Sequence, residues 1–271
     1  MIELMDIADE AQRLIETSRQ LSEKSEELER AAADLSSANQ RLRALDAQKD
    51  EFLSQVSHEL RTPMTAIRSF SEILLDEKTP PEDRQRFLGI VHEESLRLTR
   101  LLDEILDLSR LEAGTLDIDL VELDVQDVVT ATIASVTGLS QEHGVSVLSD
   151  PATGEVRVRA NADRLRQVLL NVLTNAVKYN GSGDPQIRVN TKRNGSSVEI
   201  DIIDNGGGVS RNEALVVFDK FARGTRSGRG QGAGLGLPIS RAIMRMMDGD
   251  LDLVFLPDQT SFFRVRLPAL S

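Results

Sequence analysis

A heptad repeat at the start of this 271-residue chain constrains its fold more than any other feature. Apolar residues recur at every seventh position, as Ile7, Leu14, Leu21, Leu28, Leu35 and Leu42. Neither Pro nor Gly occurs before Pro63. This spacing predicts that residues 1–49 form a long helix that pairs with a second copy in a parallel coiled coil. A lone solvated helix is the alternative, although one leucine per heptad is a narrow stripe for it.

A second helical region is predicted for residues 50–114. Two apolar series with helical spacing flank the stretch DEKTPPEDRQ, whose consecutive prolines predict a break between two helices. Gly114 is a typical helix stop and marks the end of the region. Two helices joined in this way form a hairpin, and two hairpins close a four-helix bundle. We therefore expect a helical-hairpin dimerisation domain.

Residues 115–271 mix strand and helix patterns without regular alternation. Strands are predicted for LDIDL (116–120), VSVLSD (145–150), VRVRA (156–160), QIRVNT (186–191), SVEIDIID (197–204), DLDLVF (250–255) and FFRVRL (262–267). Helices are predicted near 125–138, 161–179 and 235–247. This order predicts a third domain in which helices cover one face of a mixed sheet.

Composition excludes several classes of protein. The chain has no Cys, so it can form neither a disulfide nor a thiolate metal site. A net charge of −12 argues against a general nucleic-acid binder. No apolar run approaches the length of a membrane span, so we expect no membrane contact from this segment. The absence of Cys also fits a cytoplasmic location, although a longer parent protein could be anchored in a membrane.

The stretch SQVSHELRTPM contains His58, one of three histidines in the chain. In a heptad register that has Leu53 and Leu60 at a and Val56 at d, His58 falls at f and faces away from the helix contact. Glu59 follows directly, Thr62 lies about one turn further on, and Pro63 tends to kink the helix. An exposed imidazole beside a carboxylate is a candidate nucleophile, because the carboxylate can take a proton from one ring nitrogen while the other attacks. A surface histidine without function is the alternative.

Candidate ligand-binding residues lie in the stretch NVLTNAVKYN. Asn171 and Asn175 are four residues apart and share one helix face, and Lys178 lies near that face. Two amide oxygens can orient a hydrated Mg²⁺, and a lysine can offset phosphate charge. An ordinary polar helix face is the alternative.

Glycine-rich segments follow. DIIDNGGGVS ends a strand with Asp204, whose carboxylate can accept from an exocyclic amine such as that of adenine, while the glycines let the backbone approach a flat ligand. GQGAGLGLPISRAIM places Gly232, Gly234 and Gly236 before an apolar helix, whose N-terminal amides suit phosphate oxygens. The basic stretch TRSGRG before it indicates a lid over an anionic ligand, or else a solvated loop.

Taken together, these motifs resemble those of the sensor histidine kinases of two-component systems. SHELRTP resembles the family's phosphoacceptor motif, and NVLTNAVKYN, DNGGG, VFDKFARG and GAGLGL resemble its N, first glycine, F and second glycine motifs, in the family's order. The resemblance covers about residues 45–271 and implies a HisKA-type domain followed by a HATPase_c domain, an α/β sandwich with the Bergerat ATP-binding fold. It departs from the family at Asn180, where Thr or Ser is common, and at Gly207, often Pro or another residue.

The resemblance implies an ATP-dependent protein-histidine kinase with ATP and Mg²⁺ as cofactors. His58 would be the phosphoacceptor and Glu59 its base or orienting group, and Glu59 with Thr62 would aid dephosphorylation of a response regulator. In the ATP site, Asn171 and Asn175 would hold Mg²⁺, and the implied nucleotide-binding residues are Asn171, Asn175, Lys178, Tyr179, Asp204, Gly206, Gly208, Phe221, Arg223, Gly232, Gly234, Leu235, Gly236 and Leu237.

The implied partners are a second copy of the chain, the receiver domain of a separate response regulator, and an upstream sensor domain outside this chain. Two other functions are compatible with parts of the pattern. An ATPase of the chaperone or topoisomerase type shares the nucleotide fold but usually carries Glu where this chain has Asn171. A dimeric adaptor with a degenerate pocket is the non-enzymatic alternative, and the full set of motifs argues against it.

Overall fold

A computed structural model describes residues 2–76, 79–220, 222, 234–257 and 260–270. The chain divides into two compact units, one ending at Ser57 and the other beginning at His58. Each unit is described by itself.

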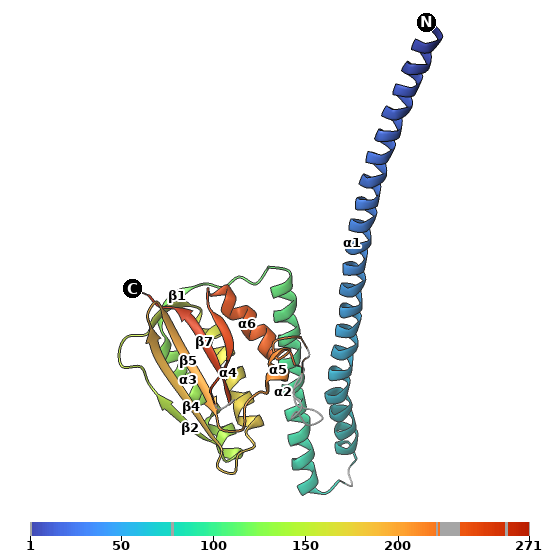
Figure 1. The fold of residues 1–271 in the computed structure, drawn as a ribbon. Coiled ribbons are helices and arrows are strands. Elements are labelled where there is room, and N and C mark those ends of the chain that lie inside the picture. Colours follow the sequence, from blue (N-terminus) through green and yellow to red (C-terminus); the bar gives the residue numbers. More distant parts are fainter. Residues whose placement is uncertain (1, 77–78, 221, 223–233, 258–259, 271) are drawn as a thin grey trace. The chain divides into compact units, whose positions relative to one another are not determined.

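The first unit consists of the N-terminal part of a single helix, α1 (Ile2–Leu74), which continues into the second unit (Figure 1). The long helix predicted from the heptad repeat is therefore confirmed. The repeat leucines Leu35 and Leu42 are 70% and 65% exposed in the single chain. A coiled coil would cover such a stripe, and this pairing stays a prediction.

A helical hairpin opens the second unit, formed by the end of α1 and by α2 (Pro81–Glu112). The rings of Phe70 and Phe87 pack against each other with centroids 5.2 Å apart. The predicted break was too long, because α2 begins inside it at Pro81. A proline is tolerated at the first helical position, where its missing N–H would have had no partner. Gly114 follows the end of α2 with φ +62°, which confirms the predicted stop.

A five-stranded mixed sheet forms the centre of the α/β domain (Figure 1), with the strand order β2-β4-β5-β7-β6. Its strands are β2 (Ser146–Asp150), β4 (Gln186–Asn194), β5 (Ser197–Asp204), β7 (Ser261–Pro268) and β6 (Asp250–Phe255). The β2–β4 pair is parallel and the other pairs are antiparallel. The strands predicted from alternating side chains are confirmed here.

A separate two-stranded sheet pairs β1 (Val121–Asp124) with β3 (Arg157–Ala160). The predicted strand at 116–120 was wrong, because the strand lies in the next four residues. Asp124 is both the last residue of β1 and the N-cap of the following helix, where its side chain accepts from the Gln126 N–H. The helix cap at Asp124 and the pairing with β3 thus fix which residues form β1. The alternation of side chains in residues 116–120 does not reveal either constraint.

Three helices pack on one face of the larger sheet: α3 (Val125–Glu142), α4 (Ala162–Tyr179) and α6 (Gly236–Met246). Leu165 and Leu169 of α4 are buried, as are Ile200 and Ile202 of β5, and these residues belong to the core. The predicted layers are confirmed. The short helix α5 (Arg211–Ala214) was not predicted, because one turn carries no periodicity; its signal is the capping box formed by Ser210 and Glu213.

Candidate nucleotide-binding site

A cavity of about 490 Å³ lies beside α4, the loop after β5, the start of α6 and one side of α2. This volume is within the range of small-molecule and cofactor sites. Ten of the predicted nucleotide-binding residues line it: Asn171, Asn175, Lys178, Tyr179, Asp204, Gly206, Gly208, Gly234, Gly236 and Leu237. Leu235 instead is fully buried in the core and does not line the cavity. Phe221, Arg223 and Gly232 lie outside the described residues.

Helix α4 supplies the polar wall of the cavity because it is amphipathic. Its apolar side is buried against the sheet, and the opposite side carries Asn171, Asn175 and Lys178. The Asn171 Nδ2 donates to the Ser240 hydroxyl at 2.9 Å, and the Asn175 Nδ2 donates to the Asn171 Oδ1 at 3.4 Å. The first bond fixes the Asn171 amide against α6, so the two neighbouring asparagines are held in place before a ligand arrives.

Glycines are required where the backbone approaches these polar groups closely. A Cβ on Gly236 would collide with the Asn171 side chain. At Gly208, with φ +62°, a Cβ would lie 2.9 Å from the Ser261 backbone nitrogen. A side chain at either position would fill or displace part of the site.

Asp204, the predicted adenine-binding carboxylate, lies at the end of β5, as expected. Its Oδ1 accepts from the Gly206 N–H at 2.9 Å, which ties the carboxylate to the glycine loop. Asn180, the departure from the family motif, donates to the Gln186 carbonyl at 3.2 Å and to the Asn205 Oδ1 at 3.1 Å. This residue therefore joins the end of α4 to the loop after β5.

The side-chain oxygens of the cavity fit a magnesium ion that also binds a phosphate ligand. In the described part of the chain, no group of three or more His, Cys, Asp or Glu residues could hold a metal by itself. Mg²⁺ prefers oxygen ligands and commonly takes only one or two from the protein, with the rest from water and substrate phosphates. The side-chain oxygens of Asn171 and Asn175 suit that arrangement.

Helix α2 supplies a wall of the cavity that sequence reasoning missed. Arg100, Asp103 and Glu104 line the same cavity as Lys178. Burial raises the pKa of Glu104 to about 7, against the opposing charges of Arg100 and Lys178. Desolvation lowers the pKa of Lys178, and the positive charge of Arg100 adds to this shift. This wall was missed because no local pattern in the sequence indicates which side of α2 packs against the α/β domain.

A buried polar contact fixes α2 to α4 next to this cavity. Asp107 is 8% exposed, and its two carboxylate oxygens accept from Arg164 at 3.1 and 2.9 Å. The Gln167 Nε2 donates to the same carboxylate at 2.8 Å. These bonds were not predicted, because the partners are more than fifty residues apart in the sequence.

The predicted phosphoacceptor, His58, is exposed on α1, as its heptad position predicts. Glu59 beside it is largely buried, and its Oε2 lies 3.8 Å from an Arg97 guanidinium nitrogen on α2. The Thr62 hydroxyl donates to the His58 carbonyl at 3.4 Å. Pro63 is buried, and α1 continues through it as one helix.

The fold and this cavity place the C-terminal part of the chain in the histidine kinase-, DNA gyrase B- and HSP90-like ATPase class, whose family profile matches residues 160–271. The profile of the His Kinase A (phospho-acceptor) domain matches residues 48–114. With both domains in tandem, the chain belongs to the sensor histidine kinase family.

Curated relatives agree with this assignment. Sensor protein KdpD of Escherichia coli is 32% identical over 262 residues, which cover 96% of this chain and 28% of the relative. The non-motile and phage-resistance protein of Caulobacter vibrioides is 31% identical over 229 residues, covering 81% of this chain and 27% of the relative. The chain thus spans about a quarter of the length of these relatives.

Solved structures share the fold. Histidine kinase AdeS of Acinetobacter baumannii superposes with a TM-score of 0.63 at 20% identity, over 79% of this chain and 98% of that chain. ShkA, solved in complex with AMPPNP, has a TM-score of 0.61 at 23% identity, over 82% and 46% of the chains. ThkA, solved with the response regulator protein TrrA, has a TM-score of 0.63 at 20% identity, over 81% and 61%. The predicted hairpin followed by an α/β ATP-binding fold is confirmed.

Within the described ranges, no helix has both the length and the apolar character that a membrane span requires.

Proposed function

We propose that this chain is the catalytic part of an ATP-dependent protein-histidine kinase that phosphorylates itself on His58. The observation that carries the proposal is the cavity in which Asn171, Asn175 and Asp204 line one space, in a chain that also presents an exposed His58. The corresponding organisation is a coiled-coil linker at 1–49, a dimerisation and phosphoacceptor domain at 50–114, and a catalytic domain at 115–271.

The reaction requires an in-line attack by a ring nitrogen of His58 on the terminal phosphorus of ATP. A P–N bond forms, and the bond from that phosphorus to the bridging oxygen breaks, so that ADP leaves with the electron pair. The proton on the other ring nitrogen passes to the Glu59 carboxylate, the base adjacent to His58. The Arg97 guanidinium, 3.8 Å from the Glu59 carboxylate, orients this carboxylate before the reaction.

Each end of the cavity has its own role in binding ATP. The Asp204 carboxylate accepts from the adenine amine, Tyr179 lies against the nucleotide, and Lys178 offsets phosphate charge. Asn171 and Asn175 would hold Mg²⁺, which would supply positive charge to offset that of the phosphate oxygens.

The phosphoryl group then passes from His58 to an Asp carboxylate of a separate response regulator. The solved complex of ThkA with TrrA, a kinase with a response regulator protein, supports this partner.

We also infer that the chain acts as a homodimer, because exposed Leu35 and Leu42 follow the heptad positions of α1. An upstream sensor domain and a cytoplasmic location belong to the same proposal.

Thr62 provides a second activity, the removal of phosphate from the regulator. Its hydroxyl lies one turn from His58, bonded to the His58 carbonyl, and can turn to orient a water molecule. Thr62→Ala should leave labelling of His58 unchanged and reduce regulator dephosphorylation roughly tenfold or more, the usual size of a lost positioning group. Equal loss of both activities in this variant would contradict a role for Thr62 in dephosphorylation alone.

The product of the reaction tests the proposal. The protein is incubated with Mg²⁺ and ATP labelled at the terminal phosphate, and protein-bound label is compared with free phosphate. The expected product is protein-bound phosphate that is labile in acid and stable in base, with little free phosphate. Free phosphate as the main product would indicate an ATPase of the chaperone or topoisomerase type and overturn the proposal.

A further inference from the structure

Two cations from different domains face the same cavity. Arg100 lies on α2 of the hairpin and Lys178 on α4 of the α/β domain, and both line the proposed nucleotide site. Glu104, one turn from Arg100 on α2, lines the cavity as well, and the charge of Arg100 acts on the pKa values of both Glu104 and Lys178. Two cations and one carboxylate that line the same cavity form a site that suits an anion.

We propose that α2 completes the phosphate end of the nucleotide site: Arg100 binds the terminal phosphate, and Glu104 partly offsets the charges of Arg100 and Lys178 before the nucleotide binds. This inference rests on the proposed function, because it assigns a new residue to the same site.

The guanidinium of Arg100 is available for such a ligand. Its Nε donates to the carbonyl of Leu96 in the same helix at 3.3 Å. Its other nitrogens make no hydrogen bond or ion pair with any residue that the structure describes. By contrast, the Nη1 of Arg164 on α4 donates to both Asp107 and Gln167. An unengaged guanidinium can form the paired N–H bonds that phosphate oxygens accept best.

Glu104 acts as a substitute for phosphate before the nucleotide binds. No hydrogen bond or ion pair of Glu104 or Lys178 occurs within the described part of the chain, so neither charge is locked in a fixed pair. The charged groups on the elements around them are Arg97, Arg100, Asp103 and Asp107 on α2, Glu213 on α5, and Asp204 at the end of β5. An incoming phosphate brings more negative charge than one carboxylate and therefore displaces Glu104 from the two cations.

The position of α2 indicates which phosphate Arg100 meets. Arg97, Arg100 and Glu104 are spaced three and four residues apart, so they share one side of α2. At the N-terminal end of this side, Arg97 lies 3.8 Å from Glu59, the neighbour of His58. A phosphate bound against this side of α2 therefore faces the hairpin that carries His58. The terminal phosphate is the one that is transferred to His58, so it is the phosphate that Arg100 binds.

Binding of two nucleotides to the full chain tests this assignment. Isothermal titration in Mg²⁺ would compare AMPPNP, which has a terminal phosphate, with ADP, which lacks it. Arg100→Ala should weaken AMPPNP binding roughly tenfold and ADP binding less than about threefold, as expected for one lost charge-assisted contact. Arg100→Lys, which keeps the charge but not the paired donors, should give an intermediate loss.

Arg110→Ala is the matched control, since Arg110 is an exposed arginine on α2 that does not line the cavity. It should bind both nucleotides as the unaltered protein does. Equal weakening of AMPPNP and ADP in Arg100→Ala, or no weakening of either, would overturn the assignment. Because binding is read without labelling of His58, a protein that discriminates the two nucleotides through Arg100 but forms no phosphohistidine would contradict only the proposed function.

Discussion

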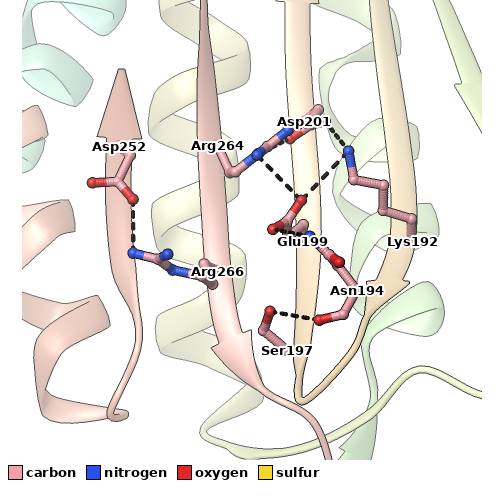
Figure 2. A network of polar contacts seen from close by, with 8 residues as sticks. All are labelled: Lys192, Asn194, Ser197, Glu199, Asp201, Asp252, Arg264 and Arg266. Carbon is pink, nitrogen blue, oxygen red and sulfur yellow. Dashed lines mark hydrogen bonds and ion pairs between the residues drawn. The ribbon is translucent and has the colours of Figure 1, made fainter. Parts of the chain in front are cut away.

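Two clusters of charge in the second unit differ in how their members are paired. On the face of the sheet away from the helices, Glu199 and Asp201 are about 5% exposed and lie among Lys192 and Arg264 (Figure 2). Glu104 and Lys178 both line the cavity, and neither forms an ion pair within the described structure. The first arrangement stabilises the fold, and the second leaves charge available for a ligand.

Their pKa shifts express this difference. Burial alone would raise the pKa of Asp201, but hydrogen bonds from Arg264 and Lys192, at 2.6 to 2.9 Å, outweigh it and lower the pKa. In the cavity, burial prevails and raises the pKa of Glu104 to about 7. A buried carboxylate whose charge is held by hydrogen bonds stabilises the fold. A carboxylate in a cavity whose pKa is shifted by burial instead indicates a functional site.

We expect the largest effect for a substitution in the cavity, which should weaken nucleotide binding without lowering stability. Asn175→Ala removes an amide oxygen from the magnesium and phosphate end of the cavity, and we expect it to weaken AMPPNP binding by about 100-fold. Thermal unfolding should change little, because with the residues that the structure describes Asn175 makes a single long side-chain bond, of 3.4 Å. Asn212→Ala, at an exposed position in α5, is the control and should alter neither quantity. A large loss of stability in Asn175→Ala would show that the residue is structural.

The converse change breaks the sheet cluster. Asp201→Ala removes one of the two carboxylates that Arg264 and Lys192 share, the other being Glu199, and we expect the free energy of unfolding to fall by about 2 kcal/mol. Denaturant unfolding followed by circular dichroism measures this, and AMPPNP affinity should stay within about twofold, because the cluster does not line the cavity. A strong loss of nucleotide binding in a folded Asp201→Ala protein would contradict the separation.

A smaller effect concerns pH, where the two carboxylates act in opposite directions. The raised pKa of Glu104 means that the folded state binds its proton more tightly, so this contribution is fully present below pH 4.5 and is lost as pH rises through about 7. The lowered pKa of Asp201 gives a contribution that is present above pH 3.8 and lost as pH falls through the lower folded value.

Denaturant unfolding between pH 4.5 and 7 measures the Glu104 contribution. Glu104→Gln should flatten the decline in stability over this window and should also bind AMPPNP about threefold more tightly at high pH, since no carboxylate competes with phosphate. Glu93→Gln, at an exposed position of α2, should keep the slope of the unaltered protein. An unchanged slope in Glu104→Gln would show that the carboxylate is not held in the buried setting.

The smallest effect lies at the edge of the sheet cluster. The Arg266 Nη2 lies 3.0 Å from the Asp252 carboxylate, but the two side chains are 49% and 30% exposed. We expect Arg266→Ala to lower the free energy of unfolding by less than about 0.5 kcal/mol, because water screens such pairs. A loss as large as that of Asp201→Ala would show that the cluster is one cooperative unit rather than a buried centre with an exposed edge.

Much of the nucleotide site could be predicted from the sequence, since its polar residues come from short segments with fixed local geometry. Asn171, Asn175 and Lys178 share a side of one helix because of their spacing, and Asp204 ends a strand with strong alternation. Gly208 and Gly236 likewise allow the close backbone approaches that their segments indicated.

The wall formed by α2 could not be predicted, because it depends on contacts between residues far apart in the chain. Arg100 and Glu104 belong to a helix whose apolar series predicted only a hairpin, and the Asp107–Arg164 contact has no local signal. The sheet cluster was hidden for a related reason. Alternation in SVEIDIID assigns Glu199 and Asp201 to the polar side of the strand, yet long basic side chains on neighbouring strands bury both.

The identity of the acceptor is the central claim, and one measurement tests it directly. The unaltered protein and His58→Gln are each incubated with Mg²⁺ and ATP, and the phosphorylated residue is located by tandem mass spectrometry under non-acidic conditions. We predict one phosphate on His58 in the unaltered protein and none in His58→Gln, which should still bind AMPPNP normally. Acid-labile phosphate retained on the His58→Gln protein, or located on His92 or His143, would contradict the account.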